Sequence, residues 1–295
     1  MPDLTLQPLP HPPFDELVEH LVVRRHLAEQ ADPDRARAAA EAGVERFRER
    51  VQVLDVLDAA RAVGRVWLVE QGDDRAVLRL VLDDPHDAPA VRTLVEALAR
   101  EQGARRLTVG VYPGDPATEA FADDPGMQTA AVQMRLPLTD DLPPEHVVVL
   151  QPMDQAAYAV WEADEIESYA EARARSGETP ERALEVSREQ HAELLPDGLA
   201  TEHHEFFVGL VDGEPVGTLW IGTERPMAFV YDVAVDEAHR RRGYGGGLMR
   251  AGALWAREHG SHALGLNVFG YNTGARALYD ALGYETVETF VGKEL

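Results

Sequence analysis

Short apolar runs alternate along the chain with stretches whose apolar residues recur about every 3.6 positions. The runs are typical of buried strands, and the periodic stretches are typical of helices that pack on a sheet. In the first half we predict strands at 4–6, 51–56, 63–69, 76–82, 107–112 and 130–136, and helices at 14–29, 33–47 and 89–102. This order indicates a mixed α/β fold.

The second half has the same order of elements, after a polar, proline-bearing linker at 138–145. The turn Asp212-Gly213-Glu214 favours a hairpin between two of its strands. Strands are predicted at 146–150, 206–211, 215–222 and 229–235, and helices at 153–176, at 179–195 and from the glycines at 243–247 to about 259. We therefore expect two domains, residues 1–142 and residues 143–295.

Individual residues of the two halves also correspond. Val63-Gly64-Arg65-Val66-Trp67 matches Val216-Gly217-Thr218-Leu219-Trp220 at an offset of 153, and residues 99–103 match 256–260 at an offset of 157. The offset changes within the segment that joins the strand at 76–82 to the next helix, which we call the crossing. In the first half it comprises residues 85–89 and is shorter than its counterpart in the second half. Chance similarity between helices rich in Ala, Arg and Glu is the alternative, but the anchors keep a consistent order. The pattern predicts an internal repeat.

The composition narrows the function classes. The 295 residues include no cysteine, which excludes disulfides, thiolate metal sites and a cysteine nucleophile. A net charge of −24 argues against nucleic-acid binding, which needs a basic face. No apolar run approaches the roughly 18 residues that span a bilayer, and residues 1–3 do not resemble a signal peptide. We expect a cytoplasmic monomer or homodimer without membrane or nucleic-acid partners.

A glycine-rich segment follows the strand at 229–235 and carries the pattern Arg240-x-x-Gly243-x-Gly245. Glycines at a helix start let a ligand approach the unpaired main-chain amides, which together with the helix dipole and guanidinium groups favour phosphate. A flexible connection is the alternative reading. The segment lacks the Gly-Lys-Ser/Thr of a P-loop and the third glycine of a dinucleotide fingerprint. It therefore predicts an anion site of another kind.

This segment resembles the acetyl-CoA pyrophosphate loop of the GNAT superfamily of N-acetyltransferases. A second signature of that family lies downstream, at Leu266–Phe269, Asn272, Ala275, Ala277–Tyr279 and Leu282–Tyr284. For residues 147–295 the resemblance implies an α/β fold with a mixed, mostly antiparallel twisted sheet, flanked by helices, whose fourth and fifth strands splay apart. The repeat implies a second GNAT-like domain at 1–142. That copy looks degenerate, because its crossing, Pro85-His86-Asp87-Ala88-Pro89, has neither arginine nor glycine.

The resemblance also implies acetyl-CoA as the acyl donor. The amide of Val233 would polarise the acetyl carbonyl, and Tyr279 would protonate the leaving sulfur. Asp232 is the first candidate for the base that deprotonates the amine, with Glu205 and Glu165 behind it; a structural or substrate-anchoring role for Asp232 is the alternative. The residues expected to bind the cofactor are Val233, Val235, Arg240, Arg241, Arg242, Gly243, Tyr244, Gly245, Gly246 and Asn272.

In GNAT folds the first two helices of the domain overhang the acceptor. The candidate acceptor residues are therefore Trp161, Glu162, Glu165, Glu167, Tyr169 and, from the next strand, His204. Adjacent His203 and His204 would point to opposite faces of a strand, so with the more distant His191 they do not predict a metal site.

Taken together, these features predict an enzyme that transfers an acetyl group directly to a primary amine of a small, cationic acceptor. Two alternatives stay open. One is a tandem acetyltransferase that resembles mycothiol synthase. The other is a non-enzymatic sensor that binds acyl-CoA.

Overall fold

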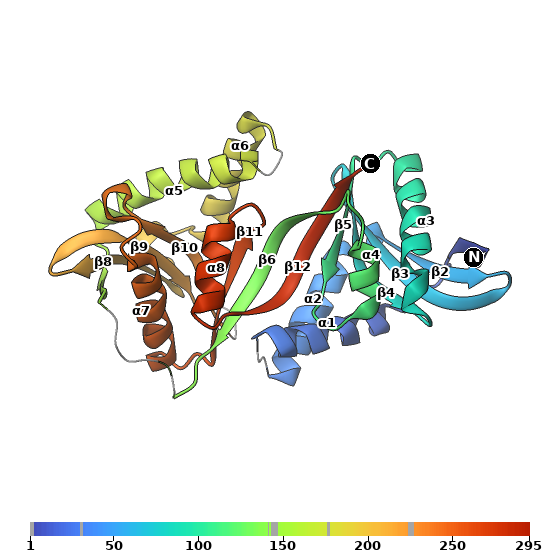
Figure 1. Ribbon diagram of the computed structural model, residues 1–295, viewed down its shortest axis with the longest axis horizontal. Helices are drawn as coiled ribbons and strands as arrows, with labels where there is room; N and C mark the ends of the chain where they lie inside the picture. Colours follow the sequence, from blue (N-terminus) through green and yellow to red (C-terminus); the bar gives the residue numbers. More distant parts are fainter. Residues whose placement is uncertain (1–2, 30–31, 141, 143–146, 176–177, 224–226) are drawn as a thin grey trace. The chain divides into compact units, whose positions relative to one another are not determined.

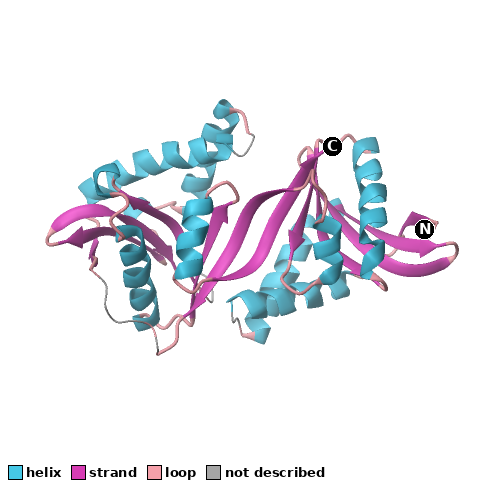
Figure 2. Ribbon diagram, viewed as in Figure 1, coloured by secondary structure: helices cyan, strands magenta, loops and turns pink. Residues whose placement is uncertain are grey.

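The computed structural model describes the chain except for residues 1–2, 30–31, 141, 143–146, 176–177 and 224–226. The chain forms two compact units (Figures 1 and 2). Unit 1 consists of Met1–Gln133 together with Thr286–Leu295, and unit 2 consists of Met134–Glu285. The domains predicted from the sequence meet at 142 and 143 instead, and they assign the last ten residues to the second half.

Unit 1 has a sheet with the strand order β1-β2-β3-β4-β5-β12-β6. β4 and β5 are parallel, and β12 is antiparallel to β5. Its strands are β1 (Leu4–Pro8), β2 (Val51–Asp58), β3 (Arg61–Gln71), β4 (Asp74–Leu82), β5 (Arg106–Val111), β12 (Glu285–Glu294) and the first part of β6 (Gln128–Pro137). Its helices are α1 (Phe14–Glu29), α2 (Pro33–Phe47), α3 (Ala88–Glu101) and α4 (Pro116–Ala122), with short 3-10 turns at Arg48–Arg50 and Pro85–Asp87.

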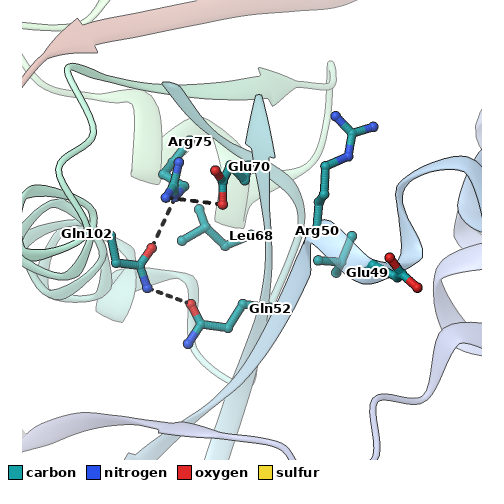
Figure 3. Close-up of a pocket in the computed structure, with 8 residues that line it drawn as sticks. Glu49, Arg50, Gln52, Leu68, Glu70, Arg75 and Gln102 are labelled. Atoms are coloured by element: carbon teal, nitrogen blue, oxygen red, sulfur yellow. Dashed lines mark hydrogen bonds and ion pairs between the residues drawn. The ribbon is translucent and has the colours of Figure 1, made fainter. Parts of the chain in front are cut away.

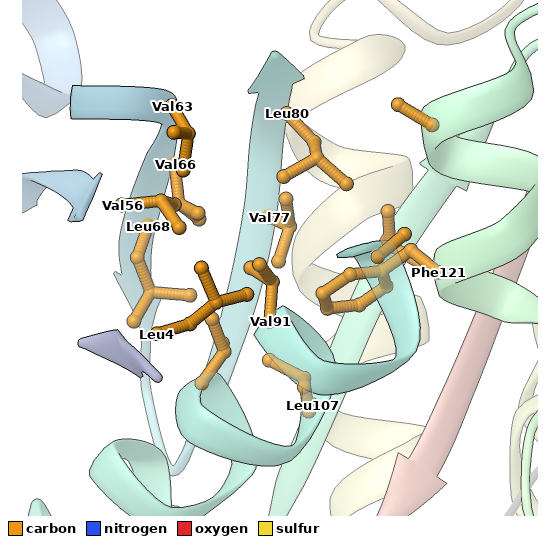
Figure 4. Packing of buried hydrophobic residues seen from close by; sticks show 14 of the residues in the cluster. Leu4, Val56, Val63, Val66, Leu68, Val77, Leu80, Val91, Leu107 and Phe121 are labelled. Atoms are coloured by element: carbon orange, nitrogen blue, oxygen red, sulfur yellow. The ribbon is translucent and has the colours of Figure 1, made fainter. Parts of the chain in front are cut away.

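Both faces of this sheet are covered, because successive strand residues point to opposite sides. Val66 packs in a cluster with residues of α3 and α4, such as Val91 and Phe121 (Figure 4). Trp67, the next residue, packs against α1 and α2 through Leu17 and Val44. The sheet of unit 1 is therefore the middle layer between two pairs of helices.

Unit 2 has the strand order β6-β11-β10-β9-β8-β7. Its strands besides β6 are β7 (Val149–Pro152), β8 (His204–Val211), β9 (Glu214–Gly222), β10 (Ala228–Val235) and β11 (Ala263–Phe269). Its helices are α5 (Gln155–Arg175), α6 (Pro180–Leu194), α7 (Tyr244–Glu258) and α8 (Thr273–Ala281), with 3-10 turns at Gly198–Ala200 and Glu237–His239. The strand expected at 146–150 lies partly outside the described residues; β7 begins at Val149.

The two faces of β9 pack against different elements. A side chain at Gly252 of α7 would come within 2.8 Å of Leu219, so this glycine lets α7 approach the sheet closely. Trp220 points to the other face, where it packs with Trp161 of α5 and Phe206 of β8. This second face carries the candidate site described below.

The predicted splay between the fourth and fifth strands is confirmed in both units. In unit 2, β10 pairs with β11 only at Ala228–Val230, whereas it pairs with β9 as far as Val235. In unit 1, β4 pairs with β5 only at Asp74–Val77, although β4 continues to Leu82. The far half of the fourth strand in each unit therefore has one edge without a strand partner.

Strand register confirms the internal repeat. In unit 1 the pairing of β3 with β4 slips at Leu78, so that Trp67 lies opposite Arg79. In unit 2 the pairing of β9 with β10 slips at Tyr231, so that Trp220 lies opposite Asp232. Both irregularities fall at the offset of 153 that the sequence predicted. A β-bulge of this kind redirects side chains, and it does so at the same place in each unit.

The strand β12 differs from the expected domain arrangement. It begins at Glu285, and from Thr286 it belongs to unit 1, where Val291 pairs with Val109 of β5. An alternating strand pattern specifies that a segment pairs and which face is buried, but not which sheet edge it joins. The sequence therefore predicts the strand without its partner.

Candidate active site

Asp232 lies on the splayed part of β10, opposite Trp220 of β9. The indole Nε1 of Trp161 donates a hydrogen bond to Asp232 Oδ2 at 3.4 Å. Trp161 itself is buried and packs edge-on against Trp220, with ring centroids 5.4 Å apart. Aromatic rings from α5 and β9 thus hold this carboxylate at the free edge of β10.

Burial raises the pKa of Asp232 from 3.8 to about 6, while the N–H groups of Trp161 and Val233 oppose this rise by stabilising the ionised form. Burial, together with the charge of Asp232, raises the pKa of Glu165 further. Glu165 follows Trp161 by four residues on α5, so both side chains lie on the same helix face. Because Asp232 has donors and Glu165 is the more strongly shifted group, Glu165 is the protonated member at neutral pH.

Tyr279 of α8 is buried, and burial together with the Asp232 carboxylate raises its pKa to about 12. The phenol therefore carries its proton at neutral pH. The ring packs against Tyr284 with centroids 5.6 Å apart. Asn272 caps the start of α8, because its Oδ1 accepts a hydrogen bond from Ala275 N at 3.1 Å.

The glycine-rich segment begins α7 in the predicted way. Gly243 is the N-cap residue with φ +86°, a conformation that favours glycine, and it offers no side-chain cap. The first helical bond runs from Gly247 N to Gly243 O, so within the described chain the amides of Tyr244, Gly245 and Gly246 precede the helical ladder. These amides are available to an anion in front of the helix.

Space around the segment fits the same use. A Cβ at Gly245 would meet only ordinary contacts, with Leu278 at 3.5 Å and Val235 at 3.6 Å, so packing inside the protein does not require glycine there. Arg240 Nε donates to Val235 O at 3.2 Å, and the side chains of Arg241 and Arg242 are exposed. Open amides, exposed guanidinium groups and a bare backbone suit the diphosphate of a coenzyme A thioester.

Comparison with known proteins agrees with this geometry. Residues 164–284 match the Acetyltransferase (GNAT) family. Over 154 residues the chain is 32% identical to the uncharacterized N-acetyltransferase YycN of Bacillus subtilis, covering 50% of this chain and 99% of that protein. The chain belongs to the GNAT family. Its members are acetyltransferases, which favours an enzyme over the non-enzymatic sensor.

Two further similarities span more of the chain. A mycothiol acetyltransferase of Rhodococcus jostii is 30% identical over 248 residues, which cover 79% of each protein. The crystal structure of a GCN5-related N-acetyltransferase from Sphaerobacter thermophilus superposes with a TM-score of 0.56 at 16% identity, covering 100% of this chain and 96% of that one. The structural likeness extends the GNAT fold to both units.

The remaining predicted residues take different places around the candidate site. Val233 and Val235 pair with Leu219 and Gly217 of β9 and have no described strand partner on the β11 side. Tyr169 lies two turns beyond Trp161 on α5, and its hydroxyl accepts a hydrogen bond from Arg173 at 3.2 Å. Geometry therefore brings Val233, Val235 and the aromatic face of α5 near Asp232.

His204 is a supporting residue of the aromatic cluster. It is buried, and its Nδ1 accepts a hydrogen bond from Trp220 Nε1 at 2.9 Å. Its ring also packs on Tyr231, with centroids 5.4 Å apart. The sequence missed Trp220 and Tyr231 as members of this cluster. Strand alternation places Trp220 on the correct face, but the bulge at Tyr231 becomes visible only from the observed register.

Unit 1 carries different chemistry at the corresponding positions. Arg79 replaces Asp232; its Nη1 donates to Glu16 O at 2.7 Å, and its guanidinium lies 4.7 Å from the centroid of the Trp67 ring. At the crossing, Asp84 Oδ1 accepts a hydrogen bond from His86 N at 2.9 Å, which places a carboxylate where unit 2 has open amides. These replacements support the interpretation of a degenerate copy.

Unit 1 does contain a separate cavity of about 460 Å³ (Figure 3). Arg75 Nε donates to Gln102 Oε1 at 3.1 Å, and Gln102 Nε2 donates to Gln52 Oε1 at 2.9 Å. These lining groups satisfy one another, and neither Arg79 nor the crossing contributes to the lining. The cavity is therefore not the counterpart of the GNAT site.

Two other properties concern the described residues alone. Within them, three or more His, Asp or Glu side chains do not gather in a way that could hold a metal ion. Among the described helices, none combines the length and apolar character needed to cross a membrane.

Proposed function

We propose that unit 2 transfers an acetyl group from acetyl-CoA directly to a primary amine of a small, cationic acceptor. The observation that carries the proposal is the pairing of a buried carboxylate, Asp232, with a buried, protonated phenol, Tyr279, beside an open helix start. The carboxylate can take the proton that prevents the amine from attacking, and the phenol can give one to the leaving sulfur.

Each group has one task in this reaction. The amides of Tyr244, Gly245 and Gly246 and the nearby guanidinium groups would hold the diphosphate, and the bound thioester supplies the acetyl group. Asp232 accepts a proton from the substrate ammonium, which leaves a neutral amine to attack the carbonyl carbon. A C–N bond forms and the C–S bond breaks. Tyr279 delivers its proton to the departing sulfur, and the second proton lost by the attacking nitrogen restores the phenol; Asp232 then releases its proton to solvent.

Aromatic and acidic side chains also support a cationic acceptor. Trp161, whose indole N–H bonds Asp232, packs with Trp220, and Trp220 stacks on Tyr231. Aromatic rings beside a carboxylate favour a cation. Glu165 of α5 is protonated at neutral pH, so it offers the acceptor a hydrogen-bonding group but no charge. The net charge of −24 would attract a cation over a longer range.

A panel of primary amines with acetyl-CoA tests the proposal, with release of free thiol as the measurement. We expect turnover with at least one cationic amine and none with its tertiary analogue. Absence of thiol release across a broad panel, with the protein shown to bind CoA, would contradict the proposal.

The mycothiol acetyltransferase similarity favours a second candidate acceptor. An acceptor of the mycothiol class therefore belongs in the panel. A kcat/KM for it that exceeds the values for simple amines by about a hundredfold would identify it as the preferred class.

A further inference from the structure

His191 of α6 is buried and has one ring nitrogen without a partner. Its Nδ1 lies 2.8 Å from the carbonyl oxygen of Ser187, one turn earlier on the same helix. A carbonyl oxygen can only accept, so Nδ1 carries the proton and Nε2 presents a lone pair. Within the described residues Nε2 is buried and accepts no hydrogen bond.

The position of His191 is set by the contact between α5 and α6. Ser187 is fully buried, and its hydroxyl donates to Ile166 O of α5 at 2.8 Å. Because Nδ1 donates a hydrogen bond to the main chain of α6, Nε2 on the other side of the ring points away from that helix. The neighbouring rings are Tyr169 of α5, at 6.1 Å between centroids, and Trp220 of β9, at 6.0 Å.

These neighbours belong to the proposed acceptor site. Trp220 lies directly opposite Asp232 in the β9–β10 pairing, and Tyr169 shares a helix face with Trp161 and Glu165. His204 touches the same indole, but its Nδ1 accepts the Trp220 N–H. His191 therefore differs from His204 in having an acceptor that the protein leaves unused.

A buried acceptor without a hydrogen bond lowers stability, and a ligand that supplies the donor removes that cost on binding. The described ring neighbours of His191 are Tyr169 and Trp220, and aromatic rings do not supply the further ligands that a metal ion needs. A hydroxyl or N–H group of the acceptor needs only this one lone pair.

We propose that His191 Nε2 accepts a hydrogen bond from a second polar group of the acetyl acceptor, separate from the amine that is acetylated. The acceptor class is then an amino alcohol, an amino sugar or a diamine, and not a simple alkylamine. This inference rests on the proposed function, because it takes Asp232 as the group that meets the reacting amine.

The test compares matched acceptors, each pair differing by the second polar group: 4-aminobutan-1-ol and 1,4-diaminobutane against butylamine, and 2-aminocyclohexan-1-ol against cyclohexylamine. Glucosamine, which carries several hydroxyl groups, extends the series to an amino sugar. In the wild-type protein we expect kcat/KM to favour the polar member of at least one pair by about tenfold or more, since a site built to bond a hydroxyl rejects the analogue that lacks it. His191→Phe should abolish this preference, lowering kcat/KM of the polar member about tenfold more than that of its alkylamine partner. His191→Gln, whose Oε1 can replace Nε2 as acceptor, should restore part of it.

His20 of α1 supplies a matched control. Its Nε2 is also buried without a partner among the described residues, but it lies in unit 1. We expect His20→Phe to leave the preference between paired acceptors unchanged. Melting temperatures of all three variants show whether each protein is folded.

Calorimetric binding of the same pairs separates this inference from the proposed function. Turnover without any preference that depends on His191 overturns the role of His191 and keeps the acetyltransferase. An equal loss by His191→Phe for both members of every pair shows a structural role and overturns the inference as well. Binding that discriminates through His191, without thiol release for any amine, supports the acceptor contact and contradicts the proposed transfer.

Discussion

Asp232 and Trp161 show how one hydrogen bond and one buried position set the chemistry of the proposed site. Removing a carboxylate from water raises its pKa, and the indole N–H limits the rise. The resulting pKa of about 6 leaves Asp232 ionised at neutral pH and basic enough to accept a proton. Glu165, whose pKa is raised further, is neutral there and adds no second negative charge.

The raised pKa of Asp232 predicts the pH dependence of the reaction. The base works only when ionised, so kcat/KM should fall as the pH drops through about 6, well above the ordinary value of 3.8. Asp232→Asn should remove this acid limb and lower kcat by about 10²- to 10⁴-fold, the usual contribution of a general base. The measurement is a pH profile of thiol release for both proteins.

The same raised pKa predicts that the stability of the protein falls as the pH rises, whereas its activity increases. Because the folded protein raises the pKa, ionisation of Asp232 costs stability, and this cost is absent below the unfolded pKa and fully present above the folded one. Asp232→Asn should therefore raise the melting temperature at pH 8 and have little effect near pH 4. A lower melting temperature at pH 8, or an unchanged acid limb, would contradict the assignment.

At the level of a single element, the start of α7 shows how a few residues leave main-chain amides open. Gly243 adopts a left-handed conformation, which places the next three amides ahead of the helical ladder. In unit 1 the corresponding turn is Pro85–Asp87, where the side chain of Asp84 caps the main chain and proline lacks a donor. The two segments share a position in the fold, and only the one in unit 2 has glycines and open amides at the start of its helix.

Gly245→Val tests this helix start. The new Cβ makes only ordinary contacts, with Leu278 and Val235, so the fold should tolerate the substitution, but the side chain would crowd a ligand that approaches the amides. We expect CoA affinity to fall by at least about tenfold, equivalent to about 1.4 kcal/mol, with a melting temperature within a few degrees of wild type. Isothermal titration with CoA measures the affinity.

Gly43→Val is the matched control for that substitution. Gly43 lies within α2, and a Cβ there meets no atom within 4 Å. This variant should bind CoA as the wild type does. Equal affinity of the Gly245 and Gly43 variants would show that the start of α7 does not hold the cofactor.

For the whole chain, the assignment of β12 decides what each unit contains. Residues 286–295 belong to unit 1, where Val291 is buried against the α3 face of the sheet and pairs with Val109. Glu288 of the same strand hydrogen-bonds Tyr112, and burial raises the pKa of Glu288 to about 7. Residues 286–294 thus add a strand beside β5 to the sheet that begins at Leu4.

Val291→Ala should destabilise unit 1 selectively. Loss of two buried methyl groups costs about 1–3 kcal/mol, and it should speed hydrogen exchange of the β5 amides at 106–111 while leaving the β10 amides at 228–230 protected. Phe290→Ala, at the more exposed neighbouring position, is the control and should change β5 exchange less. Faster exchange in β10 than in β5 would contradict this assignment of β12.

Much of the fold could be predicted because it depends on local patterns. The predicted helices and strands lie within a few residues of the observed bounds, and Gly243 lies at the helix start where the glycine-rich motif placed it. The repeat offset predicted the correspondence of Trp67 with Trp220 and of Arg79 with Asp232, which strand register confirms. The roles of Asp232, Tyr279 and the loop residues in catalysis and binding stay predictions.

The sequence by itself determined the repeated order of elements, the open helix start and the family membership. Each of these depends on residues that are close together in the chain. Folding in three dimensions decided the rest: that Trp161 bonds Asp232, that His191 keeps an unused lone pair, and that β12 joins unit 1. These contacts join positions far apart in the chain. Burial and hydrogen-bond partners at such distances follow from packing, which no local pattern encodes.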